Sequence, residues 1–112
     1  MNLDDKLRLT ELQRYDFSDA INDRTISEKD LRLIQQASTN DIIQDKITHI
    51  FKKRVHEKIV ENVKMYKKFQ YLNGFAAARA RSQSRNELQN LMESVKYISN
   101  VDKNLIVTVL TK

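Results

Sequence analysis

Basic side chains between residues 46 and 85 are the groups in this sequence best suited to hold another molecule. Eleven lysines and arginines against two carboxylates give this segment a net charge of +9, whereas residues 1–45 carry −4. Such asymmetry within one chain indicates an anionic partner. Lysine is a compact charge that suits phosphate backbones, and the guanidinium fork of arginine suits phosphate and carboxylate alike. The candidate nucleic-acid-binding residues are Lys53, Lys64, Lys67, Lys68, Arg79, Arg81 and Arg85.

The lysines among these candidates fall on one side of a predicted helix. Lys46, Lys53, Lys64 and Lys67 are spaced to lie opposite an apolar stripe, with Lys68 beside them. A row of this kind predicts either a binding ridge for phosphates or an ordinary solvated helix face.

The arginine cluster has two interpretations. Arg81 and Arg85 are four residues apart and are therefore neighbours on one helix face. Arg81 also occupies a position where the apolar pattern of the following residues would place a core side chain. Either this end of the helix projects with its arginines exposed, or Arg81 pairs with a carboxylate from the acidic residues 1–45.

Catalytic and metal-binding patterns are absent from the sequence. Asp45, His49 and His56 have similar angular positions on one helix, but His56 comes seven positions after His49, which separates the two by about 10.5 Å along the axis. There is no phosphate-binding glycine loop, nucleophile elbow or HExxH motif. We therefore expect no metal, no cofactor and no enzymatic activity.

The clearest predicted element is one long amphipathic helix from Asp41 to about Leu72. Its apolar residues recur in steps of four and three, which is the helical signature. They are Ile43, Ile47, Phe51, Val55, Ile59, Val63, Tyr66 and Phe69. The chain has one glycine and no proline, which favours long helices throughout.

Shorter helices are predicted on both sides of it. Asn2 is a candidate N-cap for a first helix that bears Leu3, Leu7 and Leu12 on one face. Ser27 is a candidate N-cap for a second helix, which ends near Ala37 and buries Leu31 and Ile34. A further helix is expected from Phe75 to about Ser99. The β-branched run Leu105–Leu110 fits a strand, but it also fits a helical face after Asp102.

The Asn73-Gly74 pair decides how the long helix ends. Gly74 at a helix C-terminus would start an αα-hairpin, whereas a helix that runs through Gly74 would lose about 1 kcal/mol. A helix of about 48 Å exceeds the roughly 28 Å expected for a compact globule of this length, so another chain is expected to cover part of it. The sequence thus predicts an all-α fold, a single helical domain over residues 1–112 that is completed by oligomerisation.

Composition also bounds the setting. The chain has no cysteine, so it has neither a disulfide framework nor a thiolate nucleophile. No apolar run approaches the roughly 20 residues that span a bilayer, and the acidic start lacks a secretory signal. We expect a cytoplasmic protein, or a virion protein if the gene belongs to a phage, which the richness in Lys, Asn and Ile favours.

Binding, rather than catalysis, is the function that these patterns favour. The leading hypothesis is an oligomeric accessory protein that binds nucleic acid through backbone charge. The alternative is a structural or regulatory module, such as a phage assembly or host-takeover factor, that docks on an acidic protein surface. A helix-turn-helix across residues 28–54 fits less well, because the second helix is far too long for a recognition helix. A membrane-surface helix lacks large apolar residues between its lysines.

Overall fold

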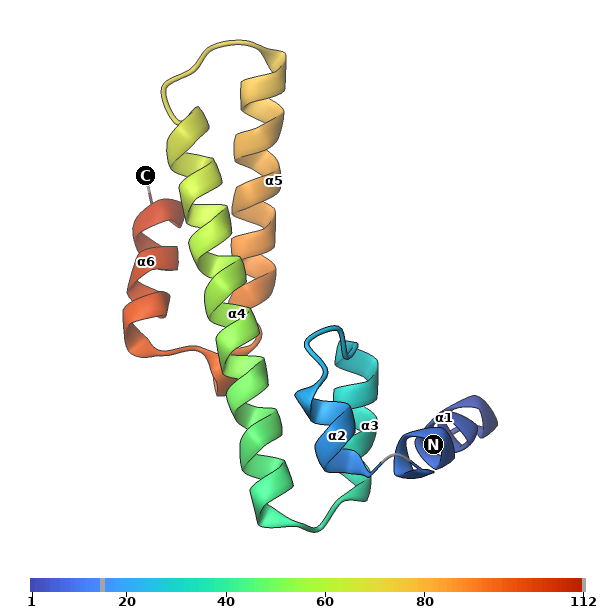
Figure 1. The fold of residues 1–112 in the computed structure, drawn as a ribbon. Coiled ribbons are helices and arrows are strands. Elements are labelled where there is room, and N and C mark those ends of the chain that lie inside the picture. Colours follow the sequence, from blue (N-terminus) through green and yellow to red (C-terminus); the bar gives the residue numbers. More distant parts are fainter. Residues whose placement is uncertain (15, 112) are drawn as a thin grey trace. The chain divides into compact units, whose positions relative to one another are not determined.

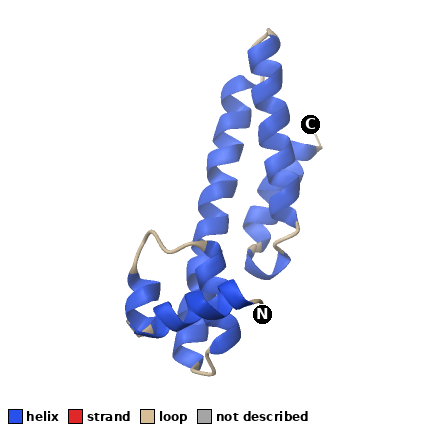
Figure 2. Ribbon diagram, turned by 90° about the vertical axis from the view of Figure 1, so that its right-hand side faces the viewer, coloured by secondary structure: helices blue, strands red, loops and turns tan. Residues whose placement is uncertain are grey.

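The fold is entirely helical in the part of the chain that the structure describes. The computed structural model describes residues 1–14 and 16–111, and every regular element there is a helix (Figures 1 and 2). The predicted all-α class is therefore confirmed. By its contacts the chain divides into two compact units, Met1–Ile50 and Phe51–Lys112, which are described in turn. The expectation of a single domain stays a prediction.

Two helix starts in the first unit follow the capping residues that the sequence indicated. The unit contains α1 (Leu3–Arg14), α2 (Phe17–Asn22), α3 (Glu28–Ala37) and the first part of α4 (Asp41–Phe69). Asn2 Oδ1 accepts a hydrogen bond of 2.8 Å from the amide of Asp5, and Ser27 Oγ accepts one of 3.1 Å from the amide of Asp30. These side chains satisfy amides that a helix start otherwise leaves without an acceptor.

The apolar core of the first unit lies around α3. Leu31 and Ile34 are fully buried as predicted, and Leu12 of α1 is buried as well. The other two leucines predicted for the inner face of α1 are not: Leu3 is 70% exposed and Leu7 is 58% exposed. Only the C-terminal part of α1 thus packs on the core through this face.

A forked ion pair joins α1 to α3. Arg8 Nε donates to Asp30 Oδ1 at 3.1 Å, and Arg8 Nη2 donates to Asp30 Oδ2 at 2.8 Å. Two parallel bonds of this kind fix both groups more firmly than a single contact would. The hydrogen bond from Arg8 holds the pKa of Asp30 below its ordinary value, although partial burial of the carboxylate opposes the shift.

The second unit is built from the later turns of α4 with α5 (Phe75–Met92), a 3-10 turn η1 (Val95–Tyr97) and α6 (Asn100–Leu110). One cluster of buried side chains joins the three helices, and the helices lie side by side in Figures 1 and 2. The members of this cluster are Ile59, Val63, Tyr66, Leu88, Leu91, Ile98, Ile106 and Val109. Phe51 packs against Tyr97 of η1 with ring centroids 5.0 Å apart.

In the C-terminal quarter of the chain, one helix ends earlier than predicted, and the segment that fitted either a strand or a helix is a helix. The helix that begins at Phe75 ends at Met92 rather than near Ser99. Ser99 instead starts a new helix, because its side chain accepts a hydrogen bond of 3.2 Å from the amide of Asp102. Residues Leu105–Leu110 lie in α6, so the strand interpretation is wrong for this segment.

The apolar stripe of α4 is covered by this chain. Ile47, Phe51, Ile59 and Val63 are all buried, although α4, with 29 residues, is about 44 Å long. These buried residues need no second chain to cover them, because the stripe contributes side chains to the cores of both units. Self-association itself stays a prediction. The helix ends at Phe69 and α5 begins at Phe75, so no continuous helix passes through Gly74.

The Arg8–Asp30 pair generates a testable prediction about acid stability. Asp30→Asn is expected to lower the free energy of unfolding by about 1–3 kcal/mol at pH 7, nearer the lower figure because Arg8 is half exposed. Because the pKa of Asp30 is lower in the folded state, its carboxylate stabilises the fold fully at pH values above the ordinary pKa of 3.8. This stabilisation is lost as the pH falls through the lowered pKa. The difference between wild type and variant in urea unfolding should therefore shrink from pH 7 to pH 3.

The matched control is Asp45→Asn, which removes an exposed carboxylate of α4 that has no hydrogen bond to the described residues. Its unfolding free energy should stay within about 0.5 kcal/mol of wild type. Equal losses in the two variants would contradict the role given to the ion pair.

Candidate functional site

The predicted lysine row lies on the solvent side of α4. Lys53, Lys64 and Lys67 are exposed on the helix face opposite the buried stripe, and they make no ion pair with the described residues. Lys68 is also exposed, and its Nζ lies 5.5 Å from the centroid of the Phe69 ring. From Lys53 to Lys68 the row extends for about 22 Å along the helix axis. These lysines offer charges that no carboxylate of the described chain neutralises.

Three cations of the first unit form ion pairs with carboxylates of the same unit. Arg8 pairs with Asp30 and Glu11, Lys29 lies 3.3 Å from Asp5 Oδ1, and Arg32 pairs with Glu28. The two units also differ in net charge. Residues 1–50 carry seven basic and ten acidic side chains, for a charge of −3, and residues 51–112 carry thirteen and five, for +8. The excess positive charge thus belongs to the second unit.

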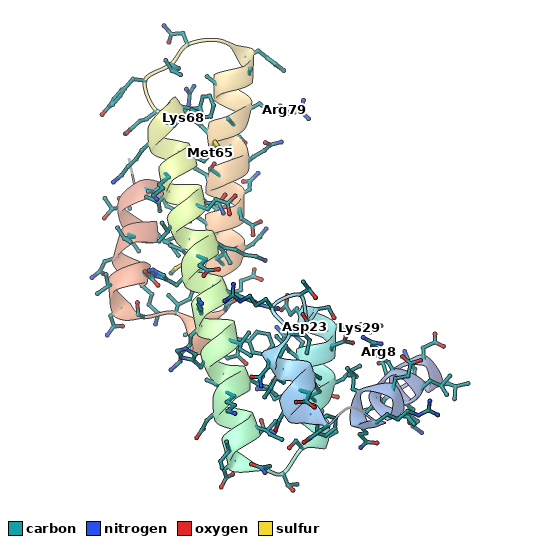
Figure 3. The ribbon with its side chains drawn as sticks, viewed as in Figure 1. Arg8, Asp23, Lys29, Met65, Lys68 and Arg79 are labelled. Atoms are coloured by element: carbon teal, nitrogen blue, oxygen red, sulfur yellow. The ribbon has the colours of Figure 1, made fainter. Side chains whose placement is uncertain are left out.

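The three predicted arginines of α5 do not form one site. Arg79 is exposed, has no hydrogen bond or ion pair with the described residues, and points away from α4 in Figure 3. Arg81 is half-buried, and its Nη1 donates to the carbonyl oxygens of Phe69 and Leu72, both at 2.7 Å. Arg85 is also half-buried, and its Nη2 donates to the carbonyl oxygen of Leu110 at 3.0 Å.

Arg81 and Arg85, both on α5, therefore contact the C-terminal ends of the two helices beside it, α4 and α6. The last carbonyl groups of a helix lack amide donors, and the helix dipole makes that end negative. Arg81 adds a charged donor at the end of α4, where the Phe69 carbonyl oxygen also accepts from the amide of Leu72 at 3.3 Å, and Arg85 supplies one to the Leu110 carbonyl at the end of α6. One interpretation of the sequence paired Arg81 with a carboxylate of residues 1–45. Arg81 is paired, but its partners are backbone carbonyl groups.

The turn between α4 and α5 is shaped by Gly74 and exposes two aromatic rings that the sequence analysis did not single out. Gly74 has φ of +108° and ψ of 163°, a conformation that is nearly restricted to glycine. On either side of the turn, the rings of Tyr71 and Phe75 are 84% and 85% exposed. The signal for such a loop was present, because Asn73-Gly74 marks a turn and leaves its aromatic neighbours without a helix to pack on.

One histidine of the long helix has a partner on α6. His56 Nδ1 lies 2.9 Å from Asp102 Oδ2 and 3.0 Å from Oδ1, and the carboxylate of Asp102 is only 6% exposed. The contact ties the first turn of α6 to α4. No group of three or more His, Cys, Asp or Glu side chains with metal-binding geometry occurs among the described residues.

A pocket in the first unit has a mainly acidic lining. It measures about 1030 Å³ and lies between α1, α2 and the start of α3. Arg8, Asp23 and Lys29, which Figure 3 labels, belong to its lining. Because Arg8 and Lys29 are already paired with carboxylates of the same lining, the pocket offers no free cation for an anionic ligand from these two residues.

Comparisons with known proteins add no family to this description. No family model, no curated protein and no solved structure matches the chain. Among the described residues, no helix is both long enough and apolar enough to cross a membrane. The functional argument therefore rests on the chemistry of the second unit.

The arginine contacts generate a second prediction. Arg81→Ala removes two charge-assisted hydrogen bonds to the end of α4 and is expected to lower the free energy of unfolding by about 1–3 kcal/mol. Arg79→Ala removes the same charge two residues earlier in the same helix and should change it by less than about 0.5 kcal/mol. Thermal and urea unfolding of both variants provide the measurement. A loss in Arg79→Ala as large as that in Arg81→Ala would contradict the assignment.

Proposed function

We propose that this protein is a non-enzymatic accessory protein that binds nucleic acid through its phosphate backbone. The observation that carries the proposal is the row of exposed lysines on α4, which have no ion pair with the described residues. Burial of the opposite face holds α4 in place and keeps these ammonium groups in solvent. An anionic polymer can replace the small counterions along such a row, and their release drives binding.

The chemistry of the side chains favours contact without base reading. Lysine acts as a point charge and lacks the planar fork that reads guanine edges. The binding residues proposed are Lys53, Lys64, Lys67, Lys68 and Arg79. Arg81 and Arg85, which the sequence included, are held by backbone carbonyl groups, so their main effect on binding is expected to pass through the stability of the second unit.

Two further features belong to the same proposal. The later turns of α4 pack with α5 as an αα-hairpin that presents the basic residues. The apolar cluster that the two helices share supports this arrangement.

The protein also self-associates, and the exposed Leu3 and Leu7 of α1 are the apolar residues that support this. Light scattering after size-exclusion chromatography should give a mass above that of one chain. Leu3→Glu with Leu7→Glu should return it to the mass of a monomer.

The lysine row generates the central functional prediction. Changing Lys53, Lys64 and Lys67 together to Gln removes up to three phosphate contacts. The slope of log K against log salt should flatten by up to about 2.7 units on duplex DNA and by up to about 2.1 on a single strand. The loss should be similar for unrelated sequences. Fluorescence anisotropy with labelled oligonucleotides between 50 and 200 mM salt, about the range in which such slopes are large, measures it.

The control separates a local row from overall charge. Lys6→Gln, Arg14→Gln and Lys96→Gln together remove the same charge from exposed positions elsewhere, so the slope should stay as in wild type. Equal flattening in both triple variants would show that only net charge matters. If an acidic protein is instead the partner, its complex with this chain should survive an excess of unrelated DNA, and the nucleic-acid proposal would then fail.

A further inference from the structure

Two aromatic rings are exposed at the turn between α4 and α5, that of Tyr71 in the loop and that of Phe75 at the first residue of α5, and the other aromatic residues that the structure describes are covered. Tyr71 and Phe75 are 84% and 85% exposed, whereas Phe17, Phe51, Tyr66, Phe69 and Tyr97 are buried or half-buried. The two exposed rings lie four residues apart, on either side of the turn at Gly74. Isolated surface apolar groups need no explanation, but large rings gathered at one loop are typical of a contact site.

Positive charge surrounds these rings. Residues 62–86 contain six lysines and arginines and no carboxylate. Lys67 and Lys68 occupy the last turn of α4, immediately before the loop, and Arg79 lies one turn into α5. Figure 3 shows Lys68 and Arg79 at this end of the two helices, together with Met65. The loop therefore offers flat apolar faces and unneutralised cations within a short stretch of chain.

We propose that the loop binds single-stranded nucleic acid, with unpaired bases stacked on Tyr71 and Phe75 and phosphates held by Lys67, Lys68 and Arg79. The inference rests on the function proposed above and specifies its substrate class. Aromatic rings next to cations are the means by which proteins hold single strands without sequence preference, because every base has a π-face. A duplex hides those faces in its stack, so Tyr71 and Phe75 would gain nothing from it.

The composition of the loop favours a nucleic acid over a membrane. An interfacial segment needs a continuous face of large apolar side chains. Here the other exposed large apolar groups near the rings are Leu72 and Met65, and the polar residues Gln70 and Asn73 interrupt them. An interfacial segment can use leucine as well as aromatic rings for its apolar face, whereas base stacking requires a flat ring, and this difference supplies the test.

The first experiment uses a spectroscopic reporter at the proposed stacking position. The chain contains no tryptophan, so Tyr71→Trp introduces a single indole that keeps an aromatic face in the loop. Titration with a 15-nucleotide oligo(dT) should quench its fluorescence to a limiting value, whereas a 15-base-pair duplex should bind through the lysines with little quenching. Equal quenching by both would overturn the inference.

The second experiment removes the rings but keeps the apolar character. In the variant with Tyr71→Leu and Phe75→Leu, affinity for oligo(dT) should fall by at least about 25-fold, since one stacked ring contributes about 5- to 100-fold. Affinity for the duplex should stay within about twofold, and the salt slope on either ligand should be unchanged, because no charge is altered. Val95→Ala with Val101→Ala, which removes exposed apolar groups outside the loop, should change neither affinity.

Each other outcome identifies what has failed. Equal wild-type binding of single strand and duplex, with no effect of the leucine variant, would overturn this inference and leave the proposed function standing. Binding of neither ligand would overturn both. Sedimentation with vesicles of phosphatidylserine and phosphatidylcholine that persists in the leucine variant would assign the loop to an anionic membrane and overturn the inference.

Discussion

Burial of one face of α4 is the constraint on which the arrangement of this chain depends. The same helix supplies Ile47 to the first unit and Ile59 and Val63 to the second. Each such side chain contributes about 1.5–3 kcal/mol when buried, whereas an exposed ion pair contributes at most about 1 kcal/mol. Apolar burial therefore decides the orientation of α4, and the lysines face solvent as a consequence. Since folding does not use their charges, these remain available to a ligand.

The second constraint is that carbonyl groups at helix ends need hydrogen-bond donors. It explains why basic residues that look alike in sequence differ in role. The second unit brings the C-terminal ends of α4 and α6 to the same helix, α5. Arg81 and Arg85 donate to the carbonyl groups at those ends. Arg79, two residues before Arg81, meets no such end and stays exposed. Helix position rather than residue type thus separates arginines that stabilise the fold from one that is free for binding.

The starts of α1 and α3 were predictable from the sequence because capping is local. Asn2 and Ser27 each bond an amide three residues ahead, so a short stretch of sequence contains the whole interaction. Tertiary contacts decided the features that were not predicted. The end of α5 at Met92 and the bonds of Arg81 depend on how α4, α5 and α6 pack. The run Leu105–Leu110 fitted two periodicities, and only the cluster around Ile106 and Val109 selects the helix. Of the candidate site, the lysine row followed from periodicity, but the exposed rings of the loop did not.

Nuclear magnetic resonance titration of the isotope-labelled protein with oligo(dT) tests the central claim most directly. If unneutralised charge on the outer face of α4 binds nucleic acid, amide shifts should concentrate between Lys53 and Lys68 and in the loop that follows, and they should diminish as salt is raised. The amides around Arg8, Lys29 and Arg32, whose side chains pair with carboxylates of this chain, should keep their positions. Shifts centred on α1 and α3, or no shifts at low salt, would contradict the account.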